Sequence, residues 1–202
     1  MRAFIAIDIP ESVRGALGQM QAKIQTSLAH SDIAKRNRES DIRWNRPEGI
    51  HLTLKFLGEI SEAQVKQVAD DLAAVQPFKK FPIEVKGFGF FPGPARPRVF
   101  WAGVEAPPDL AQLAGQIEDH LEKLGFPREP RNFNPHLTLA RFKDSRPHPS
   151  LRALVEQQGN PSFGLFEPAE FFLFESKLSP RGADYRKVAC FPHRAKEAER
   201  KI

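Results

Sequence analysis

The sequence predicts an α+β fold built from a duplicated lobe, with mostly antiparallel strands and helices packed outside them. Two observations predict this fold. Runs of adjacent strands appear beside amphipathic helices along the 202 residues. The tetrapeptide His-Leu-Thr-Leu occurs twice, at 51–54 and 136–139, in a similar order of strands and helices. A chain of this length buries a sizeable core without disulfides, so we expect one domain of two packed lobes over residues 1–202.

The first half begins with a strand, "RAFIAIDI", and a helix that opens at "PESV". Apolar residues of this helix recur at helical spacing: Val13, Leu17, Met20, Ile24 and Leu28. The polar stretch 30–41 contains three basic residues and almost nothing apolar, which predicts a mobile loop with solvated charges rather than an RNA contact. A short extended piece, "IRWN", precedes the first motif strand, "IHLTLKFLG". Ser61 then opens a second helix over "EAQVKQVADDLAAV".

The second half continues with two strands joined by the Pro-rich loop "FFPGPARPR". A helix over "PPDLAQLAGQIEDHLEKLG" ends at Gly125, where glycine is a common helix terminator. The second motif strand, "PHLTLARF", follows a polar lead-in. We expect a short helix in "SLRALVEQQ" and two closing strands in "FGLFEPAEFFLFESKL" and "DYRKVACF". The charged residues 194–202 are expected to be a disordered tail.

Composition restricts the function classes. The net charge of +5 and the sequence pI near 9.5 favour a polyanionic partner. The apolar run at the N-terminus is broken by Asp8 and Pro10, so it is too short and too polar for a signal peptide or a membrane span. The single cysteine, Cys190, lies in the apolar run "VACF" and is expected to be a buried structural thiol. These features predict a cytoplasmic protein.

The two His-x-Thr strands carry the candidate chemistry. Alternate residues of a strand share a face, so His51 and Thr53 point one way while the leucines point into the core, and His136 and Thr138 repeat this arrangement. Attack on a phosphodiester needs one group that takes a proton from the nucleophile and another that gives a proton to the leaving oxygen. Two imidazoles perform both tasks near neutral pH. The threonine hydroxyls would donate to the non-bridging oxygens, where negative charge grows.

A further position distinguishes the two copies. Phe56 stands five residues after the start of the first motif and Arg141 five residues after the start of the second. A phenylalanine there either stacks on a base or belongs to the core, and an arginine either clamps phosphate oxygens or is a surface charge. Strict alternation places both side chains on the face opposite the histidines. They join the site only if each strand ends or twists before them.

These motifs resemble those of RNA 2′,3′-cyclic phosphodiesterases, which belong to the two-histidine phosphoesterase superfamily and were first described as 2′-5′ RNA ligases. The similarity extends over nearly the whole chain. It includes "RAFIAIDIP", "HLTLKFLGEI", "GFGFFPGPARPRVFWAGV", "FNPHLTLARF" and "ESKLSPRGADYRKVACFPH". The resemblance implies a bilobal fold with pseudo-twofold symmetry, in which each lobe gives one motif to a central cleft between two mostly antiparallel sheets.

The resemblance also implies hydrolysis of a terminal 2′,3′-cyclic phosphate to a 2′-phosphate without a metal or other cofactor. It assigns the general acid to His51 and the general base to His136. Tyr185 and Arg186 resemble a family position near the cleft. Arg98, beside the aromatic pair Phe100 and Trp101, would steer the RNA backbone unless it is a solvated loop residue. The expected partners are RNA ends or small cyclic nucleotides. No protein partner is required and a monomer is expected.

Two alternatives remain at this level. The same machinery would serve a small cyclic nucleotide phosphate, or would join RNA ends through a 2′-5′ bond, because the reverse reaction uses the same histidines. An RNA-binding module with a relic site is the alternative from another class. The remaining histidines lack partner motifs and are predicted to be surface groups: His30, His120, His148 and His193. No set of His, Cys, Asp and Glu shows zinc spacing, and no Gly-rich phosphate loop occurs.

Overall fold

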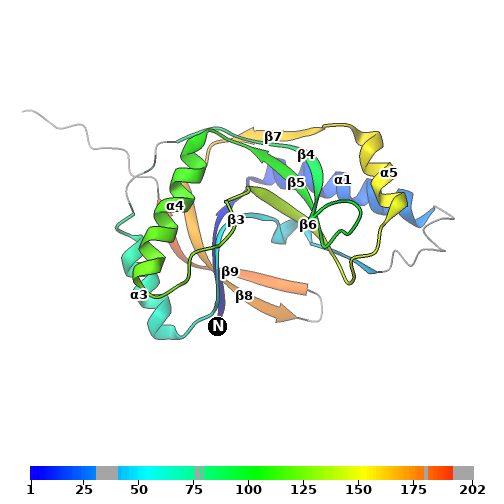
Figure 1. Cartoon of the computed structure of the whole chain (residues 1–202). Coiled ribbons are helices and arrows are strands. Elements are labelled where there is room, and N and C mark those ends of the chain that lie inside the picture. The colour runs from blue at the N-terminus through cyan, green and yellow to red at the C-terminus, as the bar shows by residue number, and fades with distance from the viewer. Residues whose placement is uncertain (31–40, 76–77, 79, 180–181, 193–202) are drawn as a thin grey trace, which may run out of the picture.

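The computed structural model describes residues 1–30, 41–75, 78, 80–179 and 182–192 (Figure 1). Their strands form one nine-stranded sheet in the order β7-β4-β5-β6-β3-β1-β8-β9, with β2 paired to β6. All of these strand pairs are antiparallel. The two motif strands, β3 (His51–Glu59) and β6 (His136–Phe142), are neighbours joined at one residue pair, Leu52 and Leu137. The sheet is therefore two half-sheets with a narrow join.

One half-sheet contains β3, β1, β8 and β9, and the other contains β6, β5, β4, β7 and β2. The bounds of the first set are β1 Arg2–Asp8, β8 Glu170–Ser179 and β9 Gly182–Pro192. The bounds of the second set are β2 Ile42–Trp44, β4 Ile83–Phe91, β5 Val99–Glu105 and β7 Ser162–Phe166. A duplicated α+β arrangement with mostly antiparallel strands is thus confirmed, although the two sheets predicted from the sequence touch at their motif strands.

The α-helices of the described residues form two pairs, one at each end of the molecule (Figure 1). The helix bounds are α1 Glu11–Ala29, α3 Glu62–Leu72, α4 Pro108–Lys123 and α5 Pro149–Gln158. Helices α3 and α4 contact each other, and α4 contacts β3, whereas α1 contacts α5 and β7. The chain therefore crosses between the halves, because β1 belongs to one half-sheet and the helix that follows it covers the other.

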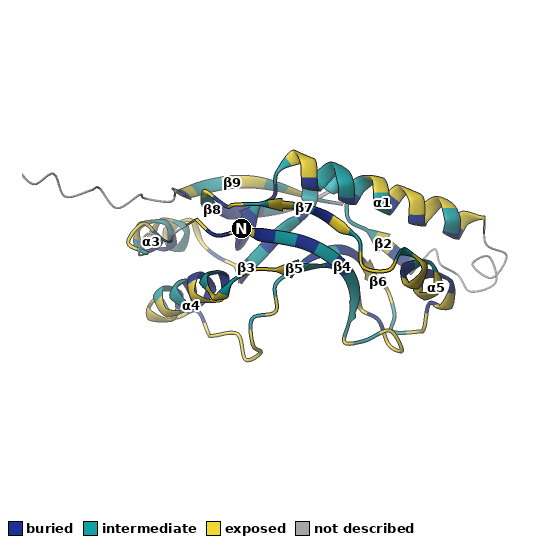
Figure 2. Cartoon of the chain, turned by 90° about the horizontal axis from the view of Figure 1, so that it is seen from above, coloured by how far each residue is buried: buried dark blue, intermediate teal, exposed yellow. Residues whose placement is uncertain are grey.

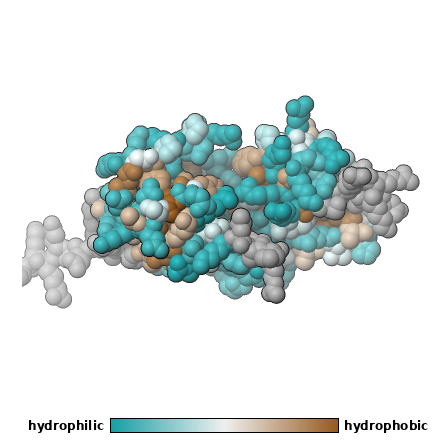
Figure 3. Space-filling model, turned by 90° about the horizontal axis from the view of Figure 1, so that it is seen from below, coloured by the Kyte–Doolittle hydropathy of each residue, from teal (hydrophilic) through white to brown (hydrophobic). Residues whose placement is uncertain are grey.

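Burial explains where each helix lies. The apolar stripe predicted for α1 faces the sheet, and so does that of α4, with Leu110, Leu113, Ile117 and Leu121 all buried (Figure 2). Helix α3 is short and ends at Leu72, yet its start is well defined: Ser61 accepts from the backbone of Gln64, whose side chain accepts from the backbone of Ser61. The surface seen from below is mostly hydrophilic, with hydrophobic side chains gathered mainly toward the end that carries α3 and α4 (Figure 3).

The structure corrects two expectations about the closing strands. The segment "FGLFEPAEFFLFESKL" is two strands, because β7 pairs with β4 while β8 pairs with β1 in the other half-sheet. Cys190 is exposed on β9, where its thiol donates to Glu170 at 2.9 Å, so it is no buried core thiol. Partial desolvation and the Glu170 carboxylate together raise the pKa of Cys190 to about 11. Residues 31–40 of the predicted mobile loop 30–41 and the tail 194–202 lie outside the described residues.

Within the described part of the chain, none of the helices is long and apolar enough to cross a membrane.

Candidate active site

The two His-x-Thr motifs meet at the centre of the sheet. Leu52 and Leu137 are fully buried and face each other across β3 and β6. An antiparallel register centred on this pair sets His51 across from Thr138, and Thr53 across from His136. The alternation predicted from the sequence is present, since all four polar residues are half-buried and the leucines are in the core. We call the side of β3 and β6 that carries the two histidines the histidine face.

Each imidazole is held by a backbone carbonyl two residues earlier in the chain. Nδ1 of His51 lies 2.9 Å from the carbonyl oxygen of Gly49, and Nδ1 of His136 lies 2.8 Å from that of Asn134. A carbonyl oxygen only accepts, so Nδ1 carries the proton in both rings. The other nitrogen, Nε2, keeps its lone pair in the neutral ring. Both imidazoles are therefore prepared to exchange a proton through Nε2.

The surroundings of the two rings differ. The ring of His51 stacks on Phe4 at 4.5 Å between centroids, and Tyr185 packs edge-on against it at 5.0 Å. The ring of His136 meets the edge of Phe91 at 4.9 Å and is farther from Trp101 at 6.4 Å. The sequence analysis missed Phe4 and Phe91 as neighbours of the histidines, because these contacts join strands that are distant along the chain.

Burial changes the proton affinity of both histidines. It lowers the pKa of His51 to about 4, although the Gly49 carbonyl and the carboxylate of Asp8 act in the opposite direction. Burial also lowers the pKa of His136. The guanidinium of Arg141 contributes to lowering the pKa of both rings, so it lies near both. Both imidazoles are neutral at pH 7 when no substrate is bound.

A β-bulge in each motif strand brings Phe56 and Arg141 to the histidine face. In β3 the register with β1 skips Leu54, and in β6 the register with β5 skips Leu139. Two consecutive residues of each strand are then buried, and the alternation is reversed beyond them. Strict alternation, which placed Phe56 and Arg141 on the opposite face, is therefore wrong here.

The surroundings of Phe56 and Arg141 agree with a position on the histidine face. Phe56 is 57% exposed, which excludes the core alternative, and its ring lies 6.2 Å from that of Phe4, the residue stacked on His51. Arg141 is exposed, and its positive charge contributes to the lowered pKa of both histidines. An aromatic ring and a guanidinium thus flank the paired histidines, one from each half-sheet.

Each bulge is held by a side chain that the sequence analysis missed. Next to the first bulge, Lys55 turns into the core and donates to both carboxylate oxygens of Glu118 at 2.9 and 2.8 Å. At the second, the carbonyl of Leu139 accepts from the backbone of Asn45 at 2.8 Å and from the amide of Gln21 at 3.1 Å. Gln21 is a polar residue within the apolar stripe of α1, and this exception to the apolar pattern could have identified it from the sequence.

The other predicted site residues are placed differently. Tyr185 packs against both His51 and Phe4, so it belongs to the histidine face. Arg186 is the next residue of β9 and points to the other side, where its Nε donates to Glu175 at 2.8 Å. Arg98 precedes β5 and its side chain is exposed, and its backbone pairs with Phe91 and Phe142. The structure brings Tyr185 to the histidines but does not bring Arg186 there.

The other histidines that the structure describes do not join the site. His30 is exposed, as predicted. His120 is half-buried and its Nδ1 lies 2.7 Å from the carboxylate of Asp71, which ties α4 to α3. The prediction of a surface position is wrong for His148, which is 6% exposed and packs against the ring of Phe142 at 4.6 Å. His193 lies outside the described residues.

Two His-x-Thr strands placed side by side in a sheet are the arrangement expected of a two-histidine phosphoesterase. A family model for the LigT-like phosphoesterases matches residues 7–101 and 103–183. The chain belongs to this family and is a phosphoesterase.

Known proteins of similar sequence match most of the chain. An RNA 2′,3′-cyclic phosphodiesterase of Archaeoglobus fulgidus is 35% identical over 191 residues, which is 95% of this chain and 99% of that protein. A protein of the same name from Thermotoga maritima is 34% identical over 188 residues, 92% of each chain. That of Aquifex aeolicus is 36% identical over 176 residues, 82% of this chain and 92% of its own.

Solved structures agree with the fold. A crystal structure of a Thermus thermophilus protein superposes with a TM-score of 0.75 at 29% identity, over 97% of this chain and all of the other. The crystal structure of LigT from E. coli complexed with 3′-AMP has a TM-score of 0.71 at 26% identity, over 95% of this chain and 97% of that one.

Proposed function

We propose that this phosphoesterase opens the 2′,3′-cyclic phosphate at the end of an RNA and leaves a 2′-phosphate. The observation that carries the proposal is the pair of neighbouring motif strands, on which two imidazoles with free Nε2 atoms are set across from two threonine hydroxyls. The names of the curated relatives support the choice of substrate. The net charge of +5 favours a polyanion over an uncharged ligand.

The residues of the histidine face have different roles in the reaction. His51 protonates the departing 3′ oxygen, and His136 takes a proton from the attacking water on the opposite side of the phosphorus. Thr53 and Thr138 donate to the non-bridging oxygens as negative charge develops on them. Arg141, which acts on both imidazoles, neutralises the same charge.

The acid role of His51 requires that substrate changes its protonation. Its pKa of about 4 keeps the imidazole neutral at pH 7 before substrate binds. A phosphodiester anion placed beside Nε2 stabilises the imidazolium and raises this pKa, in the same direction as the carboxylate of Asp8. The assignment therefore predicts that the proton needed by the leaving group enters with the substrate or after it.

The exposed ring of Phe56 and the ring of Tyr185 supply surfaces for a nucleobase on the half-sheet of His51. The structures of E. coli LigT complexed with 3′-AMP and with phosphate support a nucleotide ligand for this chain as well. A small cyclic nucleotide phosphate would occupy the same groups, and 2′-5′ ligation would use them in reverse. A monomeric, cytoplasmic protein that needs no cofactor remains the prediction made from the sequence.

The direct test uses a short RNA with a 2′,3′-cyclic phosphate end, incubated with the protein in EDTA. Mass and phosphatase susceptibility identify the product, and a 2′-phosphate end is expected. His51→Ala and His136→Ala are each expected to abolish turnover and to leave salt-dependent RNA binding largely intact, whereas the matched control His30→Ala changes neither. An unchanged RNA end with wild-type protein would refute the proposal, and cleavage of 2′,3′-cyclic mononucleotides alone would select the small substrate.

The order of acid and base needs a second substrate, in which the leaving oxygen belongs to nitrophenol. A good leaving group does not need a proton, so loss of the acid costs little while loss of the base still stops the reaction. His51→Ala is expected to retain much of the wild-type rate on this diester, and His136→Ala is not. The reverse pattern would exchange the two roles.

A further inference from the structure

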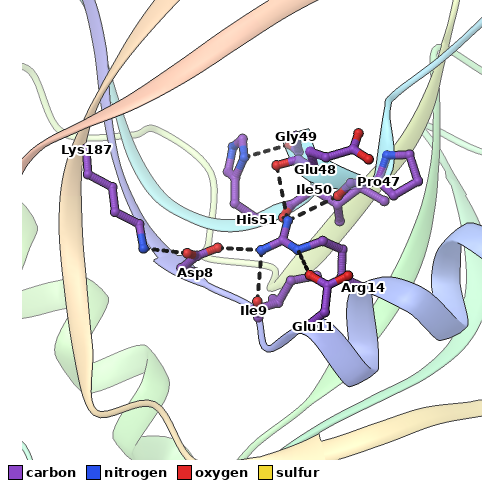
Figure 4. A network of polar contacts seen from close by, with 10 residues as sticks. All are labelled: Asp8, Ile9, Glu11, Arg14, Pro47, Glu48, Gly49, Ile50, His51 and Lys187. Carbon is purple, nitrogen blue, oxygen red and sulfur yellow. Dashed lines mark hydrogen bonds and ion pairs between the residues drawn. The ribbon is translucent and has the colours of Figure 1, made fainter.

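Arg14 lies near the start of α1, and only 12% of its side chain is exposed. Its guanidinium binds acceptors in two segments of the chain, residues 8–9 and residues 47–50 (Figure 4). Nη1 donates to the carbonyl oxygens of Pro47, Glu48 and Ile50 at 3.1, 3.1 and 3.2 Å. Nη2 donates to the carboxylate of Asp8 at 2.7 Å and to the carbonyl of Ile9 at 2.9 Å.

The first three acceptors surround one particular carbonyl. Pro47–Gly49 forms a 3-10 turn, η2, that leads into β3, and the carbonyl of Gly49 accepts from Nδ1 of His51 at 2.9 Å. Arg14 therefore binds the carbonyls before and after Gly49 and leaves that of Gly49 to the imidazole (Figure 4). Helix α1 also packs closely against this turn at Gly18, where the space is so small that an added Cβ atom would lie 3.0 Å from Cγ of Pro47.

The other two acceptors hold the turn against β1. Asp8 is the partner of His51 in the register of β1 and β3, and its second carboxylate oxygen binds Lys187 of β9 at 2.6 Å. The fork of Arg14 thus connects the end of β1 with the start of β3 at the level of the imidazole. A lysine ammonium has no planar fork and would serve one of these two groups of acceptors at a time.

We propose that Arg14 is a positioning residue for His51, which holds the turn 47–50 so that the Gly49 carbonyl keeps the proton on Nδ1 and aims Nε2 at the substrate. The inference rests on the proposed function for its kinetic consequence, but its geometric part is independent of the substrate. Without the fork the turn moves and the Gly49 bond is lost, so the neutral ring is no longer restricted to the tautomer with hydrogen on Nδ1. As the general acid, His51 is an imidazolium that donates from Nε2 and keeps hydrogen on Nδ1, so loss of the Gly49 acceptor leaves Nε2 no longer aimed at the leaving oxygen.

The test compares Arg14→Met, Arg14→Lys and Asp71→Asn in the full chain. Asp71→Asn is the matched control, because it removes the charge of another partly buried carboxylate, which contacts His120 between α3 and α4, away from the histidine face. The readouts are the ¹⁵N chemical shifts of the His51 ring at pH 7, the thermal midpoint, and kcat and KM on RNA with a cyclic phosphate end.

Wild-type protein is expected to show a protonated Nδ1 and an unprotonated Nε2 at His51. In Arg14→Met the two tautomers mix, kcat falls by on the order of 100-fold and KM changes little, since a displacement of about 1 Å at a reacting group has an effect of that size. Arg14→Lys is intermediate in both readouts. Asp71→Asn lowers the thermal midpoint but leaves the His51 shifts and kcat unchanged.

The proposal is overturned if folded Arg14→Met keeps the wild-type His51 shifts, whatever its kcat, or keeps kcat within about twofold of wild type. A failure of the proposed function is distinguishable from this outcome. It would show as no turnover by the wild-type protein, while the His51 shifts of the Arg14 variants still report on the geometry.

Discussion

The buried ion pair of Lys55 and Glu118 permits a quantitative prediction about the first bulge. Their side chains are 5% and 16% exposed, and the ammonium also donates to the carbonyl of Pro127 at 2.6 Å. Glu118→Ala leaves a buried ammonium with one neutral acceptor. Removing one partner of a buried pair costs about 3–5 kcal/mol, so we expect the free energy of unfolding to fall by that amount.

The double variant Lys55→Met, Glu118→Leu removes both charges and fills a similar volume. Its unfolding free energy is expected to lie within about 1–2 kcal/mol of wild type, because no charge remains buried without a partner. Urea denaturation monitored by circular dichroism measures all three proteins, and an unchanged m value shows that the compared states are the same. If Glu118→Ala unfolds at the wild-type urea concentration, the pair is not the buried, desolvated contact that the geometry describes.

Three further predictions concern the histidine face. The free energy of unfolding should fall by on the order of 3 kcal/mol as pH drops from about 6.5 to about 4, because unfolded His51 binds a proton in this range and the folded ring, with its lowered pKa, does not. In His51→Gln this dependence of the unfolding free energy on pH should be weaker, and an unaltered slope would contradict the burial argument. Thr53→Val or Thr138→Val should each lower kcat by about 10²–10³-fold with little change in KM, and an effect on KM alone would make these residues binding groups only. Phe56→Ala should raise KM for RNA by about tenfold or more while thermal stability stays unchanged, since the exposed ring adds little to the core; equal KM values would remove its role in base stacking.

Features that depend on one local segment were predicted from the sequence, whereas features that depend on distant contacts were not. The pairing of His51 with Thr53, and of His136 with Thr138, follows from the two-residue period of a strand and was confirmed. The burial of His148 and the exposure of Cys190 were not predicted, because both depend on what packs against them from elsewhere. The division of residues 162–179 into strands of different half-sheets was missed for the same reason, since β7 and β8 find their partners in β4 and β1.

By itself the sequence determined most of the elements, the leucines that enter the core and the two histidines that turn away from it, because side-chain periodicity along one segment is enough to assign a face. Only the tertiary structure decided that Phe56 and Arg141 join those histidines. The reversal needs the bulges at Leu54 and Leu139, and a bulge exists only in relation to the strand that pairs with it. The reversal depends on β1, on β5 and on the side chains of Glu118 and Gln21. None of these belongs to the motif segments, so the motif segments alone do not predict it.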